Sequence, residues 1–64
     1  MEETLKNTAI EYHRLAMTET DGFYYGCLVG MRSYALLSGD EAGHCFIHGL
    51  VLELREKHKQ DFDR

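Results

Sequence analysis

The stretch GFYYGCLVGMRSYALLS, residues 22–38, decides the fold of this chain. Its apolar side chains recur at steps of three and four residues, which is the period of an α-helix. They cover every side of that helix except the part occupied by Arg32 and Ser33. A helix that is apolar nearly all round must be buried nearly all round. The sequence therefore predicts a central helix that other helices have to cover.

Two rows of side chains run along this expected helix. One row contains Phe23, Cys27, Gly30, Tyr34 and Leu37, and the neighbouring row contains Tyr24, Leu28, Met31 and Ala35. The aromatic residues at its start would also suit a short strand. Glycines at 26 and 30 would weaken a strand, however, and the helical spacing continues beyond an ordinary strand length, so a helix is favoured.

Polar turn signals bound the central helix on both sides. Residues 18–22 are polar, and Asp21 is expected to cap the start of the helix. Residues 38–40, Ser-Gly-Asp, supply Gly39 as a left-handed terminator and Asp40 as the N-cap of the following segment.

The two flanking segments are amphipathic. The apolar stripe of 4–17 contains Leu5, Ala9, Tyr12 and Ala16, widened by Ile10 and Met17. The stripe of 41–60 contains Phe46, Ile47, Leu50, Val51 and Leu54, extended by Cys45 and Leu52. Both patterns predict a helix with one buried face. The expected fold is thus a single all-α domain over residues 1–64, a hairpin-like arrangement of three helices at roughly 4–17, 22–38 and 41–60.

A chain of 64 residues is too short for two helices to wrap a third on all sides. One face of the central helix is therefore expected to stay open, and exposed apolar patches mark interaction surfaces. The economical solution is a homodimer, intertwined or face to face, in which the central helices of two chains meet around a two-fold axis. The residues expected at this dimer or partner interface are Phe23, Tyr24, Gly26, Cys27, Gly30, Met31, Tyr34 and Leu37.

Gly22, Gly26 and Gly30 recur every four residues and so share one face of the helix. Each glycine costs a helix about 1 kcal/mol relative to alanine, so three of them need a reason. The loss of Cβ lets another backbone approach closely, and we expect a close helix crossing, within the chain or between two chains. The alternative is that Gly22 belongs to the turn and the other two have no role.

Composition excludes several classes of function. The formal net charge of −4 disfavours nucleic-acid binding, which depends on neutralising phosphates. We find no catalytic motif, and the chain leaves little room for a pocket, so neither an enzyme nor a cofactor is expected. The N-terminus lacks the apolar region of a signal peptide, and the longest apolar stretch falls short of the ~20 residues of a membrane span. A soluble cytoplasmic protein is the resulting expectation.

The cysteines and histidines admit more than one interpretation. Cys27 and Cys45 form no C-x-x-C motif and are expected to be free and buried, with a bridge or a thiol used across a dimer as the alternative. His44 and His48 have the spacing of a two-histidine metal chelate. Zinc requires three or four ligands, so no metal is expected. The two histidines are assigned to a polar face or an interface of the helix, and a domain stabilised by a metal ion on His44 and His48 is the alternative.

Three stretches carry a resemblance to a known group of proteins: EYHRL at 11–15, GMRSYALL at 30–37 and ELREK at 53–57. With them the chain resembles, over nearly its full length, the short proteins encoded in the exo–xis region of lambda-like bacteriophages. The resemblance implies an early phage protein made in the bacterial cytoplasm. Products of that region are associated with the choice between lysis and lysogeny, with prophage induction and with the host cell cycle. It carries over no functional residue.

The function expected from these features is a non-catalytic regulator that acts through protein–protein interaction. Its partners would be a second copy of itself and a host or phage protein. The alternative is a nucleic-acid-binding regulator with a helix-turn-helix around residues 38–40 and the segment 41–60 as recognition helix. Recognition helices present polar and basic residues at their N-terminal end, whereas this segment begins with Glu41, Ala42, Gly43 and His44.

Overall fold

The computed structural model describes residues 2–19 and 22–62, and these residues form three α-helices. Helix α1 spans Glu3–Ala16, α2 spans Phe23–Leu37 and α3 spans Glu41–Phe62. The expected all-helical class is confirmed, with no strand in the described part of the chain. Each helix begins and ends within two residues of its expected range.

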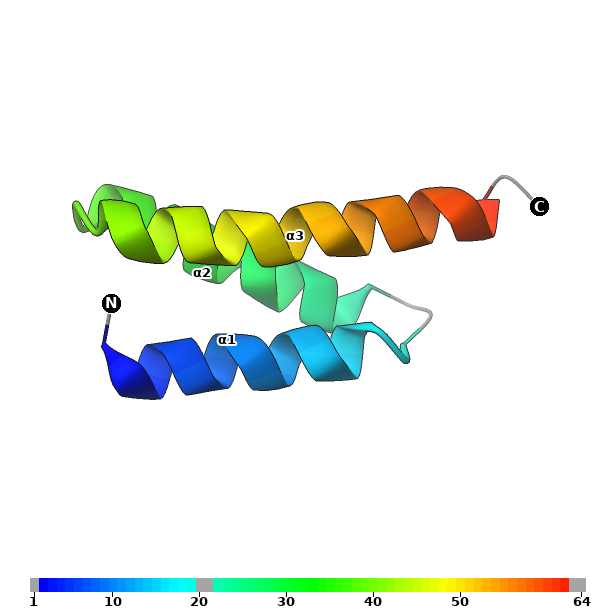
Figure 1. The fold of residues 1–64 in the computed structure, drawn as a ribbon, viewed down its shortest axis with the longest axis horizontal. Coiled ribbons are helices and arrows are strands. Elements are labelled where there is room, and N and C mark those ends of the chain that lie inside the picture. Colours follow the sequence, from blue (N-terminus) through cyan, green and yellow to red (C-terminus); the bar gives the residue numbers. More distant parts are fainter. Residues whose placement is uncertain (1, 20–21, 63–64) are drawn as a thin grey trace.

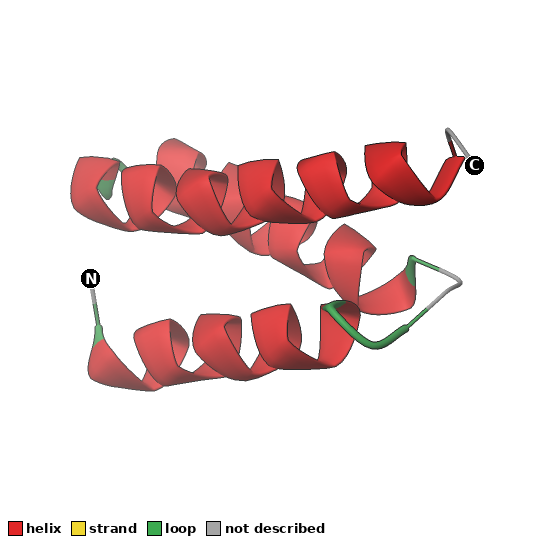
Figure 2. Ribbon diagram, turned by 45° about the vertical axis from the view of Figure 1, so that its right-hand side comes forward, coloured by secondary structure: helices red, strands yellow, loops and turns green. Residues whose placement is uncertain are grey.

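The helices alternate in direction. α1 and α3 run the same way, and α2 crosses behind them in the opposite direction (Figures 1 and 2). α2 packs most extensively against α3 and then against α1, while α1 and α3 touch each other least. The residues of α2 that these contacts bury, Leu28 and Ala35, are seven positions apart and so lie on one side of the helix.

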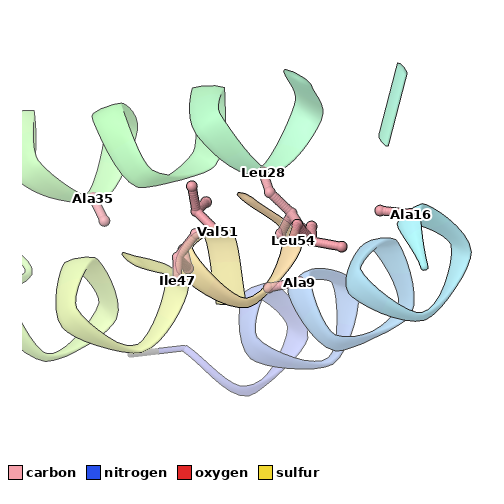
Figure 3. Packing of buried hydrophobic residues seen from close by; sticks show 7 residues of the cluster. All are labelled: Ala9, Ala16, Leu28, Ala35, Ile47, Val51 and Leu54. Atoms are coloured by element: carbon pink, nitrogen blue, oxygen red, sulfur yellow. The ribbon is translucent and has the colours of Figure 1, made fainter. Parts of the chain in front are cut away.

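The core is built from one narrow row of each helix. The buried apolar residues are Ala9, Ala16, Leu28, Ala35, Ile47, Val51 and Leu54 (Figure 3). On α2, the row that contains Leu28 and Ala35 is the one that turns inward, and Tyr24 and Met31 pack against it. α1 adds only alanine side chains to the buried set.

The apolar stripes are narrower than the sequence predicts. Ile10 on α1, Met17 at its C-cap and Leu52 on α3 were expected to widen the buried faces, but all three are exposed. In a bundle of three helices each helix meets its neighbours over a limited arc, so side chains beyond that arc remain in solvent.

The corner between α2 and α3 is closed by local hydrogen bonds. Gly39 has a φ of 79°, and the Asp40 N–H donates to the Ala35 carbonyl at 2.9 Å. The Gly39 N–H donates to the Leu36 carbonyl at 3.2 Å, which completes a Schellman termination. The Asp40 carboxylate accepts a hydrogen bond from the Gly43 N–H at 2.9 Å. The predicted roles of Gly39 as terminator and Asp40 as N-cap are thus confirmed.

At the start of α2, the described residues supply a glycine and one side-chain cap. Asp21 lies outside the described residues, and Gly22 occupies the N-cap position of α2 with a φ of 81°. A side chain from the preceding turn serves the helix instead, since the Tyr25 N–H donates to Glu19 Oε1 at 3.0 Å. The left-handed φ explains a glycine at 22, so the part of the alternative that assigns this residue to the turn is confirmed.

Candidate interaction surface

The outer side of α2 is an apolar surface that none of the described helices covers. We call it the open face, and its members are Phe23, Gly26, Cys27, Gly30, Tyr34 and Leu37. Phe23 and Tyr34 expose 63% and 62% of their surface, and Leu37 exposes 87%. Phe23, Cys27, Gly30, Tyr34 and Leu37 follow one another at three- and four-residue steps, and Gly26 lies four residues before Gly30, so the six form one continuous strip along the helix.

The predicted interface residues divide between the open face and the core. Six of the eight form the open face, whereas Tyr24 and Met31 pack against the buried cluster. The Tyr24 ring lies 5.7 Å from that of Tyr12 and 5.1 Å from that of Phe23, measured between centroids. Ring contacts therefore continue from Tyr12 on α1, through Tyr24, to Phe23 at the edge of the open face.

The glycines do not bring two helices of this chain together. A Cβ placed on Gly26 or on Gly30 would meet nothing within 4 Å. A close crossing within the chain at these two positions was one of the two expectations, and it is wrong, because α1 and α3 pack on the other side of α2 through Leu28 and Ala35. The crossing between two chains stays a prediction.

The open face is also uncharged. It contains no Asp, Glu, Lys, Arg or His, although the chain as a whole carries a formal charge of −4. The one arginine of α2 lies on another side of the helix, where Arg32 Nη1 is 3.1 Å from His48 Nδ1 on α3. An uncharged strip with two aromatic side chains has the composition of a protein interface core.

His44 and His48 lie beside this α2–α3 contact. Their rings stack with centroids 5.8 Å apart and planes 6° from parallel. A guanidinium can only donate, so Arg32 takes up the lone pair of His48 Nδ1. Within the described residues, His, Cys, Asp and Glu side chains form no group of three that could hold a metal ion. His48 thus links α3 to α2 through Arg32, and His44 stacks on it from the same helix.

The two cysteines are free, and they are more exposed than expected. Cys27 is half-buried on the open face, and Cys45 is exposed beside a cleft of about 380 Å³ at the α2–α3 corner. The cleft is lined by Leu36, Gly39, Glu41, His44 and Cys45. The prediction that Cys45 is buried is wrong because Ile47, two residues on, faces the core, and such neighbours point to nearly opposite sides of a helix.

Polar side-chain contacts lie on the other sides of the helices. The Arg55 Nε–H donates to the Tyr25 hydroxyl oxygen at 2.9 Å, and His13 Nε2 lies 2.9 Å from Glu53 Oε2 across α1 and α3. On the surface of α1, Arg14 hydrogen-bonds the Glu11 carboxylate and holds the pKa of Glu11 below its usual value. The same contact raises the pKa of Arg14. None of these groups belongs to the open face.

Comparisons with protein-family models, with curated proteins and with solved structures find no match to this chain. Among the described helices, none combines the length and the apolar character required to cross a bilayer. Over the residues that the structure describes, this is a small all-α protein of three helices with an open apolar face on the middle one.

Proposed function

We propose that this chain is a non-catalytic regulator that acts by binding protein chains, and that it does so as a homodimer joined through the open face. The observation that supports this is the exposure of Phe23, Tyr34 and Leu37 on one side of α2. At about 200 Å² for each fully exposed side chain, the three together leave roughly 400 Å² of apolar surface in solvent. Patches of that size on small proteins are often functional.

The chemistry of the open face favours a protein over a small ligand. Aromatic residues are enriched and charges depleted in the cores of protein interfaces. The strip lies on a regular helix of 15 residues whose inner side is held by the core, so binding would order little additional backbone. The open face can therefore bind a second protein surface with only a small loss of backbone conformational entropy.

The resemblance to short proteins of the exo–xis region of lambda-like bacteriophages supports a regulatory setting. In this proposal the chain is an early phage product in the bacterial cytoplasm. It influences phage development (lysis against lysogeny, or prophage induction) or the host cell cycle. Its second partner is a host or phage protein, bound by surface that the dimer leaves free.

Sedimentation equilibrium over a wide range of protein concentration tests the self-association. We expect the wild-type chain to form dimers, and a Tyr34→Ser/Leu37→Ser double variant to remain monomeric. Leu52→Ser is the matched control, because Leu52 is a large exposed side chain on α3, away from the open face. A wild-type chain that sediments as a monomer at every concentration would contradict the proposal.

The proposed effect on phage development or on the host cell is tested in bacteria that carry a lambda-like prophage. The wild-type chain, the Tyr34→Ser/Leu37→Ser variant and the Leu52→Ser control are expressed at equal levels, and the frequencies of prophage induction and cell growth are measured. We expect the wild type and the control to change one of these quantities and the double variant to leave it unchanged. Equal effects of all three chains would break the link between the open face and regulation.

The helix-turn-helix alternative is disfavoured by the charge on α3. The first turn of α3 exposes Glu41 and Ala42, and the exposed cations Arg55 and Lys59 lie in its C-terminal half. A recognition helix needs its N-terminal end to reach base edges between phosphates. Tight binding to duplex DNA that weakens steeply with salt in a gel-shift assay would favour this alternative over the protein-binding function.

A further inference from the structure

We infer that two copies of this chain pair through antiparallel α2 helices, with the two-fold axis at Gly30 and with Tyr34 of each copy seated over Gly26 of the other. The inference rests on the self-association proposed above and assigns its orientation and register.

With the exception of Cys27, whose counterpart would be Ser33, the members of the open face are placed symmetrically about Gly30. This residue is the midpoint of α2, seven residues from Phe23 and seven from Leu37. Gly26 and Tyr34 lie four residues from it on opposite sides. A two-fold axis through Gly30 and perpendicular to antiparallel helices makes equidistant positions meet. It therefore places Tyr34 opposite Gly26 of the second copy, and Phe23 opposite Leu37 of the second copy.

These pairings match large side chains with small ones. A Cβ on Gly26 would meet nothing within 4 Å, so the surface above it is free for an incoming ring. Tyr34 exposes 62% of its surface and supplies such a ring. Gly30 meets Gly30 at the axis, where the two backbones come closest. Phe23 and Leu37, both largely exposed, close the two ends of the contact.

A parallel pairing of the same helices packs poorly. Every residue would then face its own copy, so Tyr34 would stand against Tyr34 while Gly26 stood against Gly26. One end of the interface would be held apart and a gap would remain near the other, against the close packing that protein contacts require. Antiparallel helices also bring opposite ends of their dipoles together.

The charge pattern favours a second copy as the occupant. An interface built on a two-fold axis sets each patch against itself, so any charge near the axis would oppose the same charge. The open face has no charged residue, although each chain carries a formal −4 that repels a second chain elsewhere. A second copy of the chain can therefore approach the open face without electrostatic repulsion between like charges on the two strips.

The buried area sets the strength of the pairing. The roughly 400 Å² exposed by the three large side chains is about half of the ~800 Å² that each partner buries in a standard interface. We therefore expect a reversible dimer that dissociates on dilution, and the experiment has to be made above its dissociation concentration.

Disulfide crosslinking in a cysteine-free Cys27→Ser/Cys45→Ser background measures the register. Gly30→Cys should crosslink to its own copy under a thiol–disulfide buffer. Tyr34→Cys should not, because the antiparallel arrangement holds the two copies of this position about 12 Å apart along the helix, beyond the ~7 Å reach of a disulfide. A mixture of Gly26→Cys chains with Tyr34→Cys chains should give the mixed crosslink.

Each outcome decides the inference. Efficient crosslinking of Tyr34→Cys to itself would show parallel helices and overturn the register while leaving the self-association standing. A chain that sediments as a dimer but forms neither the Gly30 nor the mixed crosslink would place the interface elsewhere and overturn the inference alone. A chain that is monomeric throughout would overturn both. Circular dichroism verifies that each variant is folded, which we expect because Cβ atoms at 26 and 30 meet nothing within the chain.

Discussion

Replacing Gly30 by alanine should move the stability of the monomer and the strength of the dimer in opposite directions. Gly30 lies in the interior of α2 without a positive φ, and a Cβ there meets nothing within 4 Å. Alanine is better than glycine in a helix by about 1 kcal/mol, so the dilute chain should gain about that much. For 64 residues this corresponds to a rise of about 7 °C in the midpoint of thermal unfolding.

In the proposed dimer the same methyl group would lie at the two-fold axis, where it would separate two backbones that are otherwise in contact. Urea unfolding followed by circular dichroism, at protein concentrations below and above the dissociation constant, measures both effects. The midpoint of the wild-type chain should rise with concentration, because a dimer of folded chains is stabilised by mass action. The midpoint of Gly30→Ala should start higher and depend less on concentration.

Gly49→Ala is the control, because Gly49 is an exposed glycine of α3 whose added Cβ would also meet nothing within 4 Å. It should gain about 1 kcal/mol and keep the full concentration dependence. Two results would refute the reasoning. A dilute Gly30→Ala chain that is less stable than the wild type, beside a stabilised Gly49→Ala, would mean that the face is covered within the monomer. An unchanged concentration dependence in Gly30→Ala would remove Gly30 from the interface.

Other perturbations test the core, the cap and the surface charges. Leu54→Ala should lower the free energy of unfolding by about 2–5 kcal/mol in urea titrations, because Leu54 is fully buried; a loss below about 1 kcal/mol would contradict its place in the core. Asp40→Ala should cost about 1 kcal/mol through the lost hydrogen bond to the Gly43 N–H, and Asp40→Asn should restore most of it. Arg14 lowers the pKa of Glu11. The Glu11 carboxylate therefore stabilises the fold at pH values above its usual pKa of 4.5, and this stabilisation is lost as the pH falls through the lowered pKa. Glu11→Gln should therefore make the acid side of the stability curve slightly flatter, and an unchanged or steeper curve would count against the contact.

The local features of this fold could be predicted from the sequence because they depend on residues near one another. Periodicity located the helices, and Gly39 and Asp40 marked the α2–α3 corner. The side of α2 that turns inward could not be chosen in this way. The Phe23 row and the Tyr24 row are both apolar and have the same spacing, so only packing against α1 and α3 distinguishes them.

The members of the candidate surface could also be predicted only in part, because helical spacing groups residues on one side of a helix but does not show which side is buried. Helical spacing grouped six of the eight interface candidates on one side of α2. It could not show that Tyr24 and Met31 would pack against the buried cluster, which depends on how α1 and α3 are placed around α2. The contact between Arg32 and His48 joins residues 16 positions apart, and no local pattern points to it.

The scarcity of large side chains where α1 meets the core has a consequence for motion. Ala9 and Ala16 are its only buried residues, and Tyr12 is the one large α1 side chain that packs against the core, so lifting α1 away separates fewer large side chains than separating α2 from α3. We expect α1 to detach transiently while the α2–α3 hairpin persists. The amide hydrogens of α1 should then exchange with solvent deuterium well before those near Leu28 and Val51, because a partial opening that releases α1 precedes global unfolding.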